Sequence, residues 1–152
     1  MLKKRSKRNR KNLNAGLPMV LIGFLIFLLG AQPGLFGLDR SPVIGFVQIA
    51  VFLVGLALIC LGGYINFSQQ WIDVEKSIAA DIGLRFVGTG YVIAAMAGMA
   101  DVFGFGAQPW PQVPIFSTLQ AIGVIIGEAI IALGFLLMFP PPKFLDRKKS
   151  AE

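Results

Sequence analysis

The sequence contains no histidine and only one cysteine, and both deficits restrict its chemistry. Without histidine it lacks the commonest general base and the commonest metal ligand. Cys60 stands alone in an apolar run, so neither a disulfide framework nor a CxxC metal site is available, and we expect an inert packing residue. HExxH, GxSxG, Walker A and GxGxxG motifs are also absent from the sequence. We therefore expect no enzyme, no catalytic residue, no metal and no cofactor.

Charge is scarce and unevenly distributed. Charged residues make up 14% of the chain, whereas soluble domains carry about 25%, and the mean hydropathy is +0.72. Half of the 14 basic residues lie near the start of the chain, at Lys3, Lys4, Arg5, Lys7, Arg8, Arg10 and Lys11. Basic ends around an apolar body are typical of membrane topology. No aromatic residue is interleaved with these charges to stack on bases, so we expect no nucleic acid partner.

The basic N-terminal segment predicts binding to the lipid bilayer surface. Each Lys or Arg near anionic lipids contributes about 1 kcal/mol, so anionic lipid headgroups are the expected partners. An acidic cytoplasmic protein partner is the alternative.

Four apolar stretches are each long enough to cross a bilayer, which needs about 20 residues per helix. Prolines support their limits, because Pro42 and Pro114 precede the second and fourth stretches and Pro140 follows the fourth. The sequence thus predicts an all-α integral membrane protein, a bundle of four transmembrane helices. The predicted spans are 15–35, 42–67, 82–104 and 114–139.

The positive-inside rule places both basic ends in the cytoplasm. The pattern resembles that of short bacterial membrane proteins with four spans, so we expect the cytoplasmic (inner) membrane of a prokaryote. The predicted organisation is a basic cytoplasmic tail (1–14), a first transmembrane hairpin (15–67), a cytoplasmic amphipathic connection (68–81), a second hairpin (82–139) and a cytoplasmic Pro/basic tail (140–152).

The connection at 68–81 contains apolar residues at helical spacing, among them Trp71, Val74 and Ile78. One interpretation is a short amphipathic helix on the membrane surface, with Trp71 at the level of the lipid headgroups. The other is that the adjoining spans simply continue into the segment.

The two halves of the chain resemble each other. An offset of 72 sets 42–67 on 114–139 without a gap, and an offset of 67 sets 16–37 on 83–104. This predicts a tandem repeat of two-helix hairpins, inserted in the same orientation and related by a pseudo-twofold axis along the membrane normal. The first span is then a counterpart of the third, which argues against a cleaved signal peptide.

Small residues recur along every predicted span. Lipid offers no hydrophobic drive for helix association, so small residues that allow close backbone contact take its place. The clearest examples are the GxxxG pair Gly123 and Gly127 and the ridge of Gly90, Ala94 and Gly98. We expect these positions to hold the two copies together in a tight bundle.

Polar residues inside the spans are few, and Glu128 is the most unusual of them. It lies about 21 Å along its helix from Pro114, near the bilayer centre. An ionised acid there costs about 2.5–3.5 kcal/mol, so we expect it to face protein or water and to be protonated much of the time. It is either a functional site or a neutral carboxylic acid bonded to a neighbouring helix.

Gln48 and Gln120 are repeat mates at matching depth. They are expected either to bond across the pseudo-twofold axis or to line a shallow outer vestibule. Asp81 and Arg85 are spaced to pair on one helix face at a membrane boundary.

Two functional classes follow. The favoured one is a non-catalytic accessory or scaffold subunit, or a homo-oligomer, that associates with itself or with other membrane subunits. The alternative is a small transporter or channel with Glu128 as its proton or cation site. The alternative predicts that Glu128 faces a cavity also lined by Gln120, Thr89 or Tyr91, whereas the favoured class predicts that a neighbouring helix or subunit caps it.

Overall fold

The protein is described by a computed structural model that covers residues 2–38, 45–71, 76–105 and 116–139, with side chains from Gly16 onward. Every regular element in these ranges is helical. The elements are α1 (Leu2–Ala31), the short 3-10 helix η1 (Pro33–Phe36), α2 (Phe46–Gln70), α3 (Ile78–Gly98) and α4 (Thr118–Met138). The predicted all-α, four-helix architecture is confirmed.

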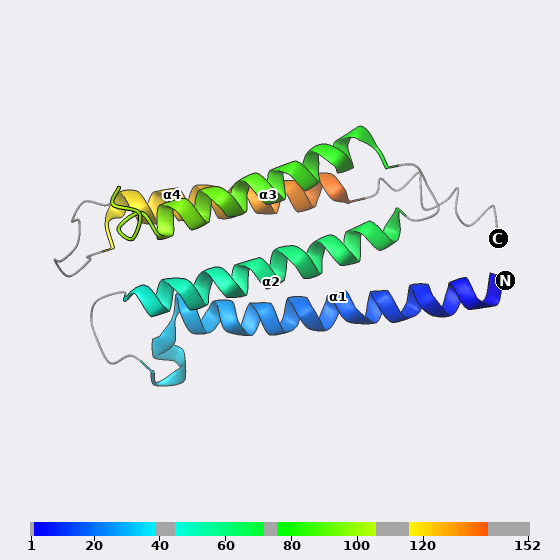
Figure 1. Cartoon of the computed structure of the whole chain (residues 1–152), viewed down its shortest axis with the longest axis horizontal. Coiled ribbons are helices and arrows are strands. Elements are labelled where there is room, and N and C mark those ends of the chain that lie inside the picture. The colour runs from blue at the N-terminus through cyan, green and yellow to red at the C-terminus, as the bar shows by residue number, and fades with distance from the viewer. Residues whose placement is uncertain (1, 39–44, 72–75, 106–115, 140–152) are drawn as a thin grey trace.

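Consecutive helices run antiparallel and form two hairpins, α1–α2 and α3–α4, that lie side by side in the same direction (Figure 1). We call the end where α1 and α3 finish the turn end, and the end where α2 finishes and α3 begins the linker end. The helices of each hairpin contact each other along most of their length, whereas the hairpins meet mainly where α2 packs on α3. The bundle therefore consists of two closely packed helix pairs that make fewer contacts with each other.

The outer surface of the bundle is apolar. Three helices are long and apolar enough to cross a membrane, namely α2, α3 and α4, and the part of α1 from Gly16 to Ala31 is a shorter apolar helix. Large side chains on these helices point away from the protein: Leu119 is 80% exposed and Leu136 73%. Exposing apolar side chains to lipid carries no hydrophobic free-energy penalty, and helices satisfy their own backbone hydrogen bonds there. The protein is a multi-pass membrane protein.

Two boundaries differ from the expectation. Helix α1 begins at Leu2 and continues through Pro18, so the basic segment extends the first span as one helix. In the connection, the described residues are the end of α2, its cap Trp71, and the start of α3 with the residues before it; residues 72–75 lie outside the described ranges, so the choice between the two interpretations stays a prediction. Trp71 is 4% exposed and its indole Nε1 donates to the Met138 carbonyl at 3.2 Å, so it packs on protein instead of facing headgroups.

Most of the closely packed glycines lie inside the hairpins, whereas Gly63 and Gly98 face the other hairpin. A Cβ added to Gly127 would lie 2.6 Å from the Gly90 carbonyl oxygen and 2.6 Å from the Ala94 backbone nitrogen. Gly123 faces Ala97 in the same α3–α4 interface. The two helices of a hairpin lie side by side along most of their length, and small residues allow the close backbone contact between them. The expectation that these positions hold the two copies together is corrected accordingly, with Gly98 as the exception: its nearest neighbour is Ile49 of α2.

The hairpins make the same contacts at positions related by the offsets 67 and 72. In the first hairpin a Cβ on Gly23 would meet the Gly55 carbonyl, and in the second a Cβ on Gly90 would meet the Gly127 carbonyl. The turns match as well. Gly37 and Gly104 both have positive φ, at 66° and 79°, and the residue after each donates to the carbonyl five positions before it.

Larger side chains fill the space between the hairpins at the linker end. The Phe67 ring of α2 stacks on the Phe135 ring of α4, with centroids 5.7 Å apart, and a Cβ on Gly63 would touch the same Phe135 ring. Cys60 is buried in the same core cluster as Leu56 and Val87, in the packing role expected of it. This end of the bundle is closed by side chains.

Candidate functional site

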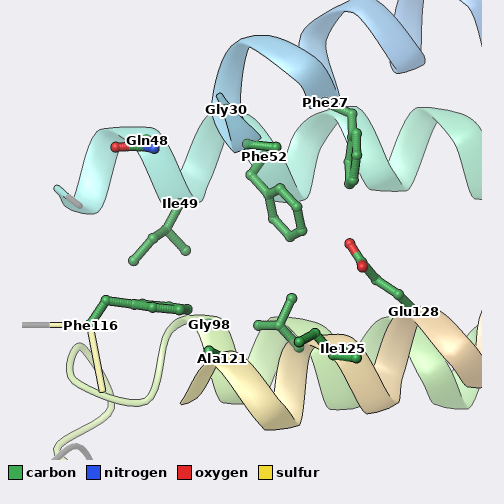
Figure 2. A pocket seen from close by; sticks show the side chains of 12 residues that line it. Phe27, Gly30, Gln48, Ile49, Phe52, Gly98, Phe116, Ala121, Ile125 and Glu128 are labelled. Atoms are coloured by element: carbon green, nitrogen blue, oxygen red, sulfur yellow. The ribbon is translucent and has the colours of Figure 1, made fainter. Parts of the chain in front are cut away.

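The hairpins separate toward the turn end, and a cavity of about 290 Å³ lies between them (Figure 2). The α1–α2 hairpin forms one wall and α4, with the end of α3, forms the other. An exact pseudo-twofold axis would match the α2–α3 contact with an equal α1–α4 contact, but α1 and α4 remain apart and the cavity occupies that gap. The residues that line it are Phe27, Gly30, Ala31, Gln48, Ile49, Phe52, Gly98, Phe116, Ala121, Val124, Ile125 and Glu128.

Glu128 lies at the inner part of this cavity. It is ten residues from either end of α4, about 15 Å along the helix axis from each, and therefore at the middle of the span. Its side chain is half-buried and points across the gap toward the first hairpin, on the side of Phe27 and Phe52 (Figure 2). Within the described part of the chain, no group hydrogen-bonds to its carboxylate.

The cavity wall is otherwise apolar, apart from Gln48 near its mouth. Three phenyl rings, those of Phe27, Phe52 and Phe116, line it together with aliphatic side chains. Glu128 is the only ionisable residue among the described residues of the lining, so no described cation balances a negative charge there. The described residues also include no group of three or more Cys, Asp or Glu side chains that could hold a metal ion.

Gln48 and Gln120 have separate positions despite their matching register. Gln120 is 5% exposed and belongs to the cap of α4. Its Oε1 accepts from the Ser117 backbone N–H at 2.7 Å, and the Gln120 backbone N–H donates to the Ser117 hydroxyl at 3.3 Å. The expected pairing of the two amides across the axis is therefore wrong. The reason is local, because Gly45 stands where the second copy has Ser117, so Gln48 has no cap partner and lines the cavity.

The other predicted polar residues lie outside the cavity. Asp81 and Arg85 form the expected ion pair, 3.0 Å apart and exposed, in the first turns of α3. Thr89 is exposed and Tyr91 packs against the buried core, so neither lines the cavity with Glu128. The basic side chains at residues 3–11 lie outside the described ranges.

The aromatic wall of the cavity, formed by Phe27, Phe52 and Phe116, was not predicted from the sequence. A signal was available in the sequence, because several cavity residues differ in kind from the residues at the offsets of 67 and 72. Phe27 aligns with Ala94, and Phe52 aligns with Val124. Glu128 itself aligns with Leu56, which is buried in the core. Differences between these aligned positions therefore pointed to the space between the hairpins.

Comparison with known proteins finds a relative that is similar in sequence to this chain. It is 29% identical over 100 residues to the glycerol uptake facilitator protein of Bacillus subtilis (strain 168). The matched region covers 63% of this chain and 36% of that protein, so the chain spans about a third of the relative's length. No family model matches the chain, and neither does any solved structure. The similarity agrees with a multi-pass membrane protein.

Proposed function

We propose that this protein is a small membrane transporter or channel in which the cavity between the hairpins leads to Glu128. The observation that carries the proposal is the position of this carboxylate: it lies midway along α4, on the wall of a cavity and without a described hydrogen-bond partner. A carboxylate kept only for helix association would be bonded to a neighbouring helix. An unpaired ionisable group in mid-membrane is typical of a substrate or ion pathway.

The setting that we propose is the cytoplasmic membrane of a prokaryote with both termini in the cytoplasm. The support is the concentration of Lys and Arg at the two ends of the chain, together with the even number of helices. In this orientation the cavity lies in the outer half of the membrane and the Phe67–Phe135 stack lies between the hairpins in the cytoplasmic half. Alternation between this state and one closed at the turn end would carry a solute across.

We further propose that the two hairpins descend from one duplicated hairpin. The equivalent glycine contacts and the equivalent turn hydrogen bonds, at offsets of 67 and 72, support this. Parallel repeats with a site at their interface are a common plan among transporters. The similarity to a glycerol uptake facilitator adds support for solute passage, although the uptake of glycerol is a property of that relative.

The test is solute flux into liposomes that contain the purified full chain. Wild-type protein should conduct at least one of glycerol, protons or small organic cations faster than empty liposomes do, and Glu128→Gln should lower that flux at least tenfold. Asp81→Asn is the matched control, because it also neutralises one carboxylate but at the exposed start of α3. If no tested solute crosses faster than in empty liposomes, or if Glu128→Gln conducts like wild type, the proposal fails.

A second candidate function is a non-catalytic accessory or scaffold subunit, or a homo-oligomer, which we propose on a different observation. The two hairpins touch each other over a limited area, and Ile125, which lines the cavity with Glu128, is 61% exposed. A partner helix against this face of α4 would cover Ile125 and cap Glu128. The native mass of the complex, measured after extraction in mild detergent, decides this: unrelated subunits at fixed ratio support it, and a lone monomer excludes it.

A further inference from the structure

The lining of the cavity is specific enough to indicate what it binds. We propose that it takes a small monovalent organic cation with an apolar body, whose charge lies against Glu128 and whose body lies against the phenyl rings. This inference rests on the proposed transport function and names the substrate class of the same site.

Charge provides the first argument. Among the described residues Glu128 is the only ionisable one in the lining, and no described Lys or Arg side chain neutralises it there. A half-buried carboxylate without a partner is stabilised by a cation, and an anionic ligand would be repelled in a site of low dielectric constant. The ligand should therefore carry one positive charge.

The aromatic wall provides the second argument. Phe27 and Phe52 come from different helices, and their ring centroids are 4.8 Å apart, so together they form a continuous apolar wall opposite Glu128 (Figure 2). Phe116 adds a third ring near the mouth of the cavity. Aromatic faces attract organic cations, above all quaternary ammonium groups, and also bury apolar substituents. A carboxylate opposite phenyl rings suits both parts of such a ligand.

The same lining is poorly suited to other ligands. A polyol has several hydroxyls, each costing about 1–3 kcal/mol if buried without a partner, and among the described lining residues only Gln48 and Glu128 have side chains that can bond to them. Divalent cations such as calcium need six or more oxygen ligands, which one carboxylate and one distant amide do not supply. The volume of about 290 Å³ has room for roughly ten atoms of water size, at about 30 Å³ each.

The experiment is equilibrium binding to the purified full chain in mild detergent. The probe is benzyltrimethylammonium, and the reference is neopentylbenzene, which has the same shape with carbon in place of the charged nitrogen. Wild type should bind the cation at least tenfold more tightly than the neutral compound. Glu128→Gln should abolish that preference by weakening cation binding at least tenfold, while Asp81→Asn, at the exposed start of α3, should bind as wild type does.

Two further variants keep the test decisive if Glu128→Gln fails to fold. Phe116→Leu removes one ring and should weaken cation binding about threefold, and Ala121→Leu fills the cavity and should weaken both ligands. Equal binding of cation and neutral compound by wild type, or unchanged cation binding in Glu128→Gln, overturns the proposal. Liposome flux separates the two claims: glycerol or proton flux without cation binding leaves transport standing and removes the substrate class, whereas cation binding without any flux removes transport alone.

Discussion

The close approach of α3 and α4 at Gly90 predicts a large difference between two neighbouring glycine substitutions. Gly90 and Gly88 lie two residues apart on α3. A Cβ on Gly90 would lie 2.5 Å from the Gly127 carbonyl oxygen and 2.8 Å from the Ile131 backbone nitrogen, both immobile backbone atoms. A Cβ on Gly88 would meet nothing within 4 Å.

The magnitude follows from two opposing contributions. Alanine improves helix propensity over glycine by about 0.8–1.0 kcal/mol, and this gain is common to both substitutions. Overpacking against backbone costs about 1–3 kcal/mol and affects only Gly90→Ala. Gly88→Ala should therefore raise the free energy of unfolding by up to about 1 kcal/mol. The free energy of unfolding of Gly90→Ala should be about 1–3 kcal/mol lower than that of Gly88→Ala.

The assay is reversible unfolding in mixed micelles by increasing SDS, followed by helical circular dichroism. Gly23→Ala is a useful third variant, because Gly23 is the repeat mate of Gly90 and a Cβ there would lie 2.7 Å from the Leu58 Cβ. Its loss of stability should resemble that of Gly90→Ala. If Gly90→Ala and Gly88→Ala unfold at the same SDS fraction, the argument from close backbone contact is refuted.

Three other predictions concern single contacts. Trp71→Phe removes the buried indole hydrogen bond to the Met138 carbonyl, so the free energy of unfolding in the same assay should fall by about 0.5–1.5 kcal/mol; no change would show that the bond contributes nothing. Gly45→Ser restores the cap residue present in the second copy, and should stabilise the protein by a few tenths of a kcal/mol and draw Gln48 away from the cavity, visible as a changed affinity for the cation probe. Cys60 is buried, so N-ethylmaleimide should label it only after unfolding, and rapid labelling of the folded protein would contradict the packing.

The sequence by itself determined the class of the fold and much of its plan. A helix that crosses lipid needs about 20 apolar residues in succession, so long apolar runs locate α2, α3 and α4. The nearby prolines bring the limits of α2 and α4 within four residues, whereas α3, which has no such proline, ends six residues before the predicted limit. The Asp81–Arg85 pair was equally readable, because side chains four apart on a helix face the same side. The sequence also identified Glu128 as the unusual acid, since apolar spans rarely contain one.

Only the tertiary structure decided which surfaces face each other. Small residues at helical spacing show that a helix has a close contact but not with which helix, and the structure assigns most of them to the partner within the same hairpin. Gln120 and Gln48 look alike in sequence, yet Ser117 is present beside one and absent beside the other, so one caps a helix and the other lines a cavity. That cavity exists because two hairpins pack at one end and separate at the other, and this relation between distant segments is not encoded in the periodicity of any single helix.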